Sequence, residues 1–315
     1  MKAVQLVGFG GPETLVVVDV PTPEVGPREV LIRVKASGVN FAETAMRQNR
    51  YAMTPPLPSI LGSEVAGIVE AVGAEVEGVA IGDRVAGSAF AAGQFFGGYA
   101  EYMVVPERFA YTIPDLFTDA EAAPLLCAGA IGYRSLALCN MSEGKTIGLT
   151  GFGASAHLVL KLIRYQYPQS EVYVFARNPE ERAFALELGA QWAGDTSDMP
   201  PYLPDCIIDT TPVWEPAVRA LECLKPGGRL VINAIRKESA DKEYLLHMDY
   251  ARHLWMEKEI KSVANVTSHD VREFIRLAAE MPFKPEVEIY PFEKANQAIL
   301  DIKQRKIKGA KVLVL

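Results

Sequence analysis

The sequence predicts an α/β protein in which a β-rich first part is joined to a doubly wound, six-stranded parallel sheet. Three observations predict it. Short strand-like stretches fill residues 1–119, six apolar stretches alternate with helical ones between residues 145 and 266, and a glycine-rich turn follows the first of those six. The chain has 315 residues, 49% hydrophobic and 23% charged, which is enough material for about two packed domains.

The charge balance and the cysteines restrict the possible partners. A net charge of −7 provides no general attraction to phosphate backbones or anionic lipid, so we expect no nucleic acid partner. The four cysteines are widely spaced and form no CxxC pair, which argues against a disulfide framework and favours a reducing cytoplasm. Residues 1–7 resemble a strand rather than a secretory signal, and no window of ~20 uncharged apolar residues suggests a membrane span.

In the first part, apolar and polar residues alternate, which is the pattern of half-buried strands. Turn signals such as Gly10-Gly11-Pro12 and Gly97-Gly98 separate the stretches. We expect strands at residues 3–7, 15–20, 30–37, 64–72, 84–89 and 99–105.

From residue 118 the pattern changes to a helix-like run that reaches residue 138, followed by strands and helices in alternation. We expect the six parallel strands at residues 145–150, 172–176, 191–193, 206–210, 229–234 and 259–266. The tail then reads as a helix, a strand, a helix and a strand, at residues 268–281, near 287, 292–305 and 311–315. Because this tail is too short for a domain, we assign residues 1–119 and 267–315 to one discontinuous domain and 120–266 to the other.

The glycine-rich turn is the strongest motif in the chain. Residues 151–156 read Gly-Phe-Gly-Ala-Ser-Ala, a G-x-G-x-x-G/A fingerprint between a predicted strand and a predicted helix. Gly151 permits the tight turn, Gly153 lets the backbone approach a pyrophosphate, and Ala156 keeps the helix near its strand. Amides at the helix start then face the phosphates, so Phe152, Ala154 and Ser155 belong to the predicted dinucleotide site.

The end of the second strand of this sheet indicates which dinucleotide binds. A carboxylate there would bind the ribose hydroxyls of NAD(H), but the strand at 172–176 is followed by Arg177 and Asn178. Arg177 can pair with a 2′-phosphate, so we predict NADP(H). The alternatives are that Arg177 is merely solvated and that Asn178 caps a helix, with Glu181 as its capping-box partner.

Several motifs of the first half resemble zinc-free, zeta-crystallin-like quinone oxidoreductases of the medium-chain dehydrogenase/reductase superfamily. They are Met1-Lys2-Ala3 with Gly10-Gly11-Pro12-Glu13, Gly38-Val39-Asn40-Phe41, Gly62-Ser63-Glu64-Val65-Ala66-Gly67, Gly82-Asp83-Arg84-Val85 and Gly97-Gly98-Tyr99-Ala100-Glu101-Tyr102. The second half is closer to zinc-type alcohol dehydrogenases, in Leu125-Leu126-Cys127-Ala128-Gly129-Ala130, in residues 151–157 and in Ser262-Val263-Ala264-Asn265-Val266. The resemblance implies a GroES-like catalytic domain beside a Rossmann domain, hydride transfer in the cleft between the two domains, and homodimers or homotetramers.

The two branches differ in whether a catalytic zinc is present. In zinc members, a Cys, a His and a Cys hold the metal at positions that are Asn40, Ser63 and Cys127 here. Neutral amide and hydroxyl oxygens are poor zinc ligands, and residues 87–98 lack the four-Cys loop of a structural zinc site. For the four histidines we expect core, cap or surface roles. The sequence therefore predicts no metal.

A missing zinc changes which substrates are favourable. Reduction of a simple ketone concentrates charge on one oxygen, which a metal would stabilise. Hydride addition to a quinone or to an enone C=C bond instead spreads the charge, so that a few hydrogen bonds can hold the anion until it is protonated. The proton-relay hydroxyl of zinc members is also replaced, by Ala42.

By resemblance to quinone oxidoreductases, Asn40 and Tyr51 are the predicted catalytic residues. Asn40 can donate two hydrogen bonds to a carbonyl oxygen, and Tyr51 can donate one or deliver a proton. The alternatives are that Asn40 caps a helix starting at Phe41 and that Tyr51 is a loop-packing ring.

Further positions are expected to line the coenzyme or substrate. Cys127 is expected as a small packing residue beside the nicotinamide, with an activated thiol as the alternative. Four residues close the fourth and fifth predicted strands at the edge where nucleotides bind: Thr210, Thr211, Asn233 and Ala234. An apolar substrate wall, or ordinary packing, is expected from Phe41, Phe90, Phe95 and Phe96.

The leading hypothesis is an NADPH-dependent reductase of quinones or enones that works without zinc. The alternatives are a zinc-free aldehyde or ketone reductase, suggested by the second half, and a crystallin-like NADPH-binding protein without turnover. The sequence leaves open the physiological substrate, one- or two-electron transfer, the proton donor and the oligomer size.

Overall fold

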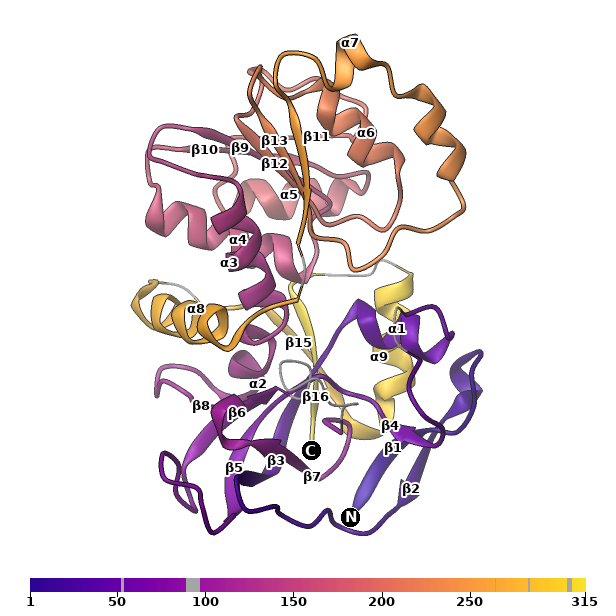
Figure 1. The fold of residues 1–315 in the computed structure, drawn as a ribbon, viewed down its shortest axis with the longest axis vertical. Coiled ribbons are helices and arrows are strands. Elements are labelled where there is room, and N and C mark those ends of the chain that lie inside the picture. The colour runs from indigo at the N-terminus through magenta and orange to yellow at the C-terminus, as the bar shows by residue number, and fades with distance from the viewer. Residues whose placement is uncertain (52–53, 89–96, 264, 283, 305–307) are drawn as a thin grey trace. The chain divides into compact units, whose positions relative to one another are not determined.

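The computed structural model describes residues 1–51, 54–88, 97–263, 265–282, 284–304 and 308–315 (Figure 1). The chain forms two compact units, here called unit 1 (Met1–Ala130 with Val266–Leu315) and unit 2 (Ile131–Asn265). The predicted domain boundaries, at 119/120 and 266/267, stay a prediction. Among the helices that the structure describes, none has both the length and the apolar character needed to cross a membrane.

Unit 1 is built mainly from antiparallel strands, as expected for a chain with short alternating stretches. Its strands are β1 (Lys2–Leu6), β2 (Leu15–Asp19), β3 (Glu29–Val39), β4 (Ser59–Ile60), β5 (Glu64–Val72), β6 (Arg84–Ser88), β7 (Tyr102–Pro106), β8 (Ala110–Thr112), β15 (Val287–Pro291) and β16 (Ala310–Val314). A small sheet has the order β2-β1-β4, and a larger one the order β15-β16-β3-β5-β6-β8, with β7 also paired to β3. Because β16 pairs with β3, the last strand of the chain completes the sheet of the first part.

Unit 1 also contains helices, and one apolar cluster joins two of them to the sheets. The helices are α1 (Phe41–Arg47), α2 (Asp119–Ala122), α8 (Ser268–Glu280) and α9 (Ala295–Lys303), with short 3₁₀ turns at Pro12–Thr14, Glu107–Phe109, Ala123–Leu125 and Phe292–Lys294. The cluster joins Met46 of α1 to Ile299 of α9 and includes Leu61 and Tyr99. This cluster holds α1 in place next to β3, where the candidate catalytic residues lie.

Unit 2 contains the predicted parallel sheet. Its strands are β9 (Thr146–Thr150), β10 (Glu171–Phe175), β11 (Trp192–Gly194), β12 (Cys206–Asp209), β13 (Arg229–Ile232) and β14 (Glu259–Ser262). All pairings are parallel and the order is β11-β10-β9-β12-β13-β14, so the order reverses between β10 and β12, at β9. The predicted α/β class with a six-stranded, Rossmann-like sheet is confirmed.

Helices cover this sheet. They are α3 (Ala128–Leu138), whose first three residues belong to unit 1, α4 (Ala154–Gln166), α5 (Pro179–Glu187), α6 (Glu215–Glu222) and α7 (Tyr250–His253), with a 3₁₀ turn at Lys242–His247. On the α6 face, Ala217 and Leu221 belong to one apolar cluster with Tyr173, Phe175 and Ile207. Because successive strand residues point to opposite faces, Val174 and Ile208 are buried on the other side of the sheet.

The structure departs from the predicted elements in one interrupted helix and in the bounds of two strands. The predicted helix at 118–138 is interrupted because Pro124 lacks the N–H that a continuous helix needs, and a 3₁₀ turn separates α2 from α3. The strand predicted at 99–105 begins only at Tyr102, and the one predicted at 259–266 ends at Ser262. Two predicted elements end on residues 89 and 305, outside the described residues.

Candidate functional site

In unit 1, Asn40 lies between β3 and α1. It occupies the N-cap position of α1, and the Glu43 carboxylate accepts a hydrogen bond from its main-chain N–H at 2.8 Å. The side-chain amide donates from Nδ2 to Glu64 Oε1 at 2.8 Å and to Ser63 Oγ at 3.2 Å. The amide hydrogens of Asn40 therefore point at protein acceptors, and donation to a substrate would require release of one of them.

Ser63 connects this amide to a second buried carboxyl group. Its hydroxyl donates to Glu43 Oε1 at 2.9 Å, and its main-chain N–H donates to the same oxygen at 3.1 Å. Glu43 is fully buried, and burial raises the pKa of its carboxyl from 4.5 to about 7, although the Ser63 and Asn40 hydrogen bonds lower it.

Glu64 is the central group of the arrangement. Its Oε1 accepts from Asn40, and its Oε2 accepts from the main-chain N–H of Cys127 at 2.6 Å. A Cβ at Gly38 would lie 2.2 Å from Glu64 Oε1, so glycine is needed at that position on β3. Burial raises the pKa of Glu64 to about 8. Sequence reasoning missed Glu43 and Glu64 because their burial depends on contacts with residues far away in the chain.

Cys127 and Tyr51 share this electrostatic environment. Burial, followed by the nearby charges of Glu64 and Glu43, raises the pKa of the Cys127 thiol well above its usual value. Burial, followed by the charges of Cys127 and Glu43, likewise raises the pKa of Tyr51, which packs half-buried against the α1 cluster. Both groups are therefore neutral at physiological pH. The structure thus brings Asn40, Tyr51 and Cys127 together in unit 1.

Of the predicted aromatic wall, Phe41 packs partly buried against the cluster under α1. Phe90, Phe95 and Phe96 lie outside the described residues.

In unit 2, the fingerprint turn has the expected place between β9 and α4. Gly151 has a φ of +75°, a conformation that favours glycine, and a Cβ there would lie 2.9 Å from Thr210 Oγ1. Phe152 is buried and packs edge-to-face on Phe184, with ring centroids 5.6 Å apart. Gly153 is the N-cap of α4 and has no side chain to cap it.

The start of α4 and the ends of β12 and β13 meet at this turn. In α4, Ala154 and Ser155 begin the helix and Ala156 is fully buried beneath it. Asn233, which follows β13 and precedes Ala234, donates from Nδ2 to Ser155 Oγ at 3.3 Å. Thr210 Oγ1 and Thr211 Oγ1 donate to Thr150 O at 2.8 Å and Asp209 Oδ1 at 2.7 Å respectively. These predicted coenzyme residues are thus adjacent in unit 2.

Arg177 and Asn178 follow β10. Arg177 is exposed, and Asn178 caps α5 by accepting from the main-chain N–H of Glu180 at 2.9 Å. Glu181 is not the capping-box partner of Asn178, because its carboxyl accepts a hydrogen bond from the Phe152 main-chain N–H. Burial raises the pKa of Glu181, and the charge of Arg177 opposes that shift. The Glu181 carboxyl group therefore lies at the fingerprint turn, whereas the sequence had indicated Glu181 only as part of a helix cap.

Potential metal ligands are sparse. Within the described ranges, no group of three or more His, Cys, Asp or Glu side chains is placed to hold a metal ion. His157 is buried in α4, where burial lowers its pKa to about 3, and His253 Nε2 lies 3.1 Å from Glu222 Oε1.

Comparison with known proteins decides the family. The model of the alcohol dehydrogenase GroES-like domain matches residues 26–115. A probable alcohol dehydrogenase, AdhA, of Mycobacterium tuberculosis is 34% identical over 97% of this chain and 93% of its own length. The chain is a medium-chain dehydrogenase/reductase.

Other relatives of this medium-chain dehydrogenase/reductase carry different names. The quinone oxidoreductase of Pseudomonas aeruginosa is 44% identical, but the match covers only 41% of this chain and 38% of that protein. A crystal structure of an NAD-dependent alcohol dehydrogenase superposes with a TM-score of 0.88 at 24% identity, covering both chains fully, and shows the shared fold. The predicted superfamily is therefore confirmed. The enzyme is an oxidoreductase of a family that binds a nicotinamide cofactor.

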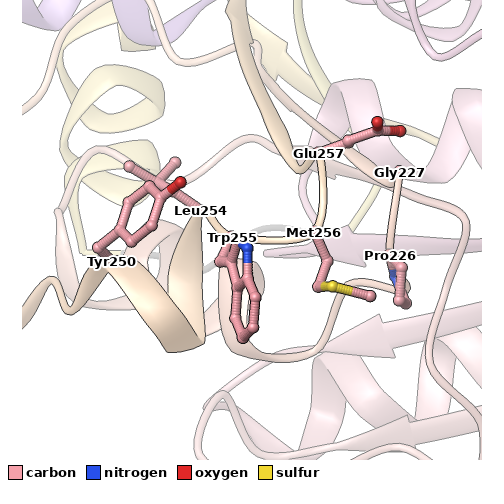
Figure 2. A pocket seen from close by; sticks show the side chains of 7 residues that line it. All are labelled: Pro226, Gly227, Tyr250, Leu254, Trp255, Met256 and Glu257. Atoms are coloured by element: carbon pink, nitrogen blue, oxygen red, sulfur yellow. The ribbon is translucent and has the colours of Figure 1, made fainter.

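A pocket in unit 2 lies away from the fingerprint turn. It measures about 610 Å³, and Figure 2 shows its lining: Pro226, Gly227, Tyr250, Leu254, Trp255, Met256 and Glu257. These residues precede β13 and β14, whereas the fingerprint turn follows β9, so in a parallel sheet the two features lie at opposite edges. The pocket therefore does not belong to the predicted coenzyme edge.

Proposed function

We propose that this medium-chain dehydrogenase/reductase uses NADPH to reduce quinones or activated C=C bonds, without a catalytic zinc. The observation that carries the proposal is the hydrogen-bonded set at the three positions where zinc members hold their metal. Asn40 and Ser63 offer an amide and a hydroxyl, and both donate to buried carboxyl groups, those of Glu64 and Glu43.

The donor set does not fit a catalytic zinc. Such a site normally uses three protein ligands drawn from Cys, His and carboxylates, of which only Cys127 is present at these positions. Binding through Asn40 or Ser63 would use neutral oxygens and would disrupt the hydrogen bonds to the carboxyl groups. We therefore derive no step through a metal.

The residues of unit 2 do fit a dinucleotide. The φ of +75° at Gly151 and the absence of a capping side chain at Gly153 leave the amides at the start of α4 available to a pyrophosphate. The exposed guanidinium of Arg177, at the end of β10, is suited to a 2′-phosphate and supports NADP(H). Thr210, Thr211, Asn233 and Ala234 would line the same edge of the sheet.

The chemistry follows from which groups are neutral and can donate. When bound, the reduced nicotinamide supplies a hydride. Tyr51 remains protonated because its pKa is raised, so its hydroxyl can donate a hydrogen bond to the developing anion. Asn40 is proposed as a second donor, and Cys127 as a small neutral side chain beside the nicotinamide. Such donors suit a delocalised phenolate or enolate.

Reduction of aldehydes or ketones is the second candidate function. It is favoured by the alcohol dehydrogenase of M. tuberculosis, which matches nearly the whole chain, whereas the quinone oxidoreductase match covers less than half. A third candidate is an NADPH-binding protein without turnover.

A substrate screen separates these candidates. NADPH oxidation is followed by absorbance with benzoquinone, a simple enone and a simple aldehyde as acceptors. We expect turnover of benzoquinone or the enone and at least tenfold lower kcat/KM for the aldehyde. Preferential turnover of the aldehyde would favour the second candidate, and NADPH binding without turnover of any acceptor would favour the third.

We also propose a homodimer or homotetramer in the cytoplasm. All four residues of β14 are exposed at the edge of the sheet, where strands of two copies can pair. The four cysteines are free thiols, which suits a reducing compartment. A monomeric mass in analytical ultracentrifugation, or an extracellular location on cell fractionation, would contradict these two proposals.

A further inference from the structure

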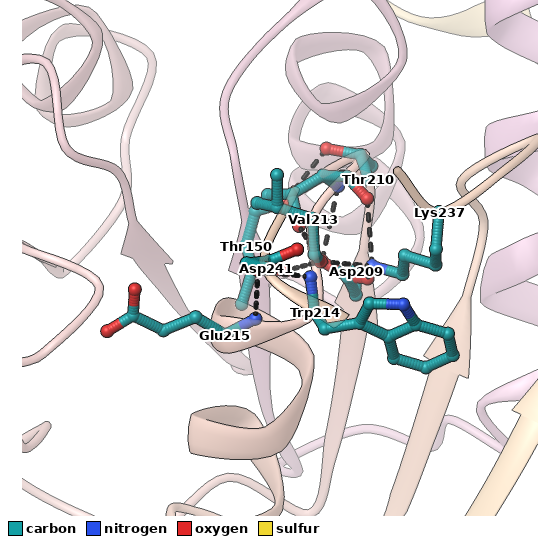
Figure 3. Close-up of polar contacts among 9 residues, drawn as sticks. Thr150, Asp209, Thr210, Val213, Trp214, Glu215, Lys237 and Asp241 are labelled. Atoms are coloured by element: carbon teal, nitrogen blue, oxygen red, sulfur yellow. Dashed lines mark hydrogen bonds and ion pairs between the residues drawn. The ribbon is translucent and has the colours of Figure 1, made fainter. Parts of the chain in front are cut away.

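A buried ion pair lies at the carboxyl end of β12, next to the fingerprint turn. Asp209 has no exposed side-chain surface and pairs through Oδ2 with the Lys237 ammonium, whose side chain is 8% exposed. Lys237 Nζ also donates to the main-chain oxygens of Thr211 and Val213, each at 2.8 Å (Figure 3). The ammonium therefore has three acceptors, one for each of its hydrogens.

The second oxygen of Asp209 connects the pair to the turn. Oδ1 accepts from Thr150 Oγ1 at 2.5 Å and from Thr211 Oγ1 at 2.7 Å. Thr150 is the last residue before Gly151, and Thr210 Oγ1 lies 2.9 Å from the place of a Gly151 Cβ. Since both Asp209 oxygens are engaged within the protein, this carboxylate is not available to ribose hydroxyls.

Lys237 belongs to the segment that follows β13, here called the 233–241 segment. Three further hydrogen bonds fasten it to the segment after β12. The Glu238 N–H donates to Pro212 O at 2.6 Å, and Asp241 Oδ2 accepts from the main-chain N–H groups of Trp214 and Glu215 at 2.7 and 2.8 Å (Figure 3). The segments that follow β12 and β13, which both lie at the predicted coenzyme edge, are thus held together around the Lys237 ammonium.

We propose that Lys237 is a positioning residue that sets the shape of the coenzyme edge. Asp209 neutralises its charge, so it acts by holding Thr210 and Thr211 against Gly151 rather than by attracting phosphate. A buried ion pair often stabilises a fold no better than apolar residues of similar volume, whereas in some proteins it specifies one arrangement of the groups around it. This inference rests on the proposed function, because it assumes that a nicotinamide coenzyme binds at this edge.

The test uses a double variant, Lys237→Met with Asp209→Asn, which removes both charges and so leaves no unpaired buried carboxylate. The matched control is Lys225→Met with Asp205→Asn. Lys225 Nζ lies 2.8 Å from Asp205 Oδ2, and Asp205 directly precedes β12, at the opposite end of the strand from Asp209. We expect the Kd and KM for NADPH to rise at least tenfold in the first variant and to change less than twofold in the control. The KM for quinone should stay within twofold in both, which general loosening of the fold would not produce.

Wild-type protein supplies an independent measurement that does not depend on whether the variants fold. Saturating NADPH should slow amide hydrogen exchange in residues 209–214 and 233–241 together. A folded double variant with wild-type affinity for NADPH would overturn the proposal, and so would coenzyme-bound wild-type protein in which neither segment gains protection. A wild-type protein that binds neither NADPH nor NADH contradicts the proposed function itself, and the positioning role with it.

Discussion

At the residue scale, Asn40 shows that a helix cap and a candidate catalytic residue can be the same residue. The sequence left open whether it caps a helix or faces a substrate, and in the structure it stands at the N-cap of α1 with its amide directed at Glu64 and Ser63. Its catalytic role stays a prediction, as does that of Tyr51. Neither carboxyl group around Asn40 was predicted, because the burial of Glu43 and Glu64 depends on contacts with residues far away in the chain.

Tyr51→Phe tests the proposed donor hydroxyl. We expect kcat for quinone to fall roughly tenfold or more, since a positioned acid typically contributes at least that much, while the Kd for NADPH stays within twofold. Tyr99→Phe is the matched control, because the Tyr99 hydroxyl is buried in the same cluster without a hydrogen-bond partner among the described residues. If Tyr51→Phe and Asn40→Ala both leave quinone turnover within about twofold, ~0.4 kcal/mol, neither residue has the proposed role.

Arg177→Ala tests the coenzyme assignment. Loss of one charge-assisted contact with a 2′-phosphate should raise the Kd for NADPH about tenfold and leave the Kd for NADH unchanged. Fluorescence titration of both coenzymes measures this, with NADH as the internal control. Equal affinity of the wild-type protein for NADPH and NADH, unaffected by the substitution, would refute the assignment.

At the scale of elements, the predictions succeeded where the hydrophobic pattern was strong and failed where the element was too short to show one. The strand, turn and helix around Gly151 were predicted because a fully buried strand precedes an apolar helix. The helix α1 was predicted only as an alternative, in which Asn40 caps a helix starting at Phe41, because it has only seven residues and buries polar side chains such as Glu43 and Arg47. Tertiary contacts, rather than an apolar stripe, therefore determine that helix.

The β3–α1 corner should make stability depend on pH. Burial raises the pKa of Glu43 and Glu64 from 4.5 to about 7 and about 8, so the folded protein retains protons that the unfolded chain would release. Their contribution to stability is fully present below about pH 4.5 and is lost as the pH rises through 7 and 8. Each unit of pKa shift corresponds to ~1.4 kcal/mol.

We therefore expect the wild-type Tm to decrease between pH 5 and pH 9. The variant with Glu43→Gln and Glu64→Gln should show a flatter profile, as measured by thermal denaturation at fixed ionic strength. A variant whose Tm changes with pH as steeply as that of the wild type would show that these carboxyl groups do not cause the dependence.

At the scale of the whole molecule, the doubly wound parallel sheet could be predicted, but the polar contacts between its strands could not. Alternating apolar strands and helices indicated a doubly wound sheet, and the short tail indicated a return to the first part, where β16 pairs with β3. Lys237 and Asp209 gave no local signal, because they meet only when β12 and β13 lie side by side. Site chemistry that depends on such long-range contacts requires a structure.

Zinc content measured together with NADPH-dependent quinone reduction, in protein dialysed against a strong chelator, tests the central claim most directly. We predict that turnover is retained when zinc is far below one ion per chain, because Asn40 and Ser63, which donate hydrogen bonds to Glu64 and Glu43, occupy two of the three ligand positions. Loss of turnover on dialysis, with recovery on adding zinc, would contradict the account.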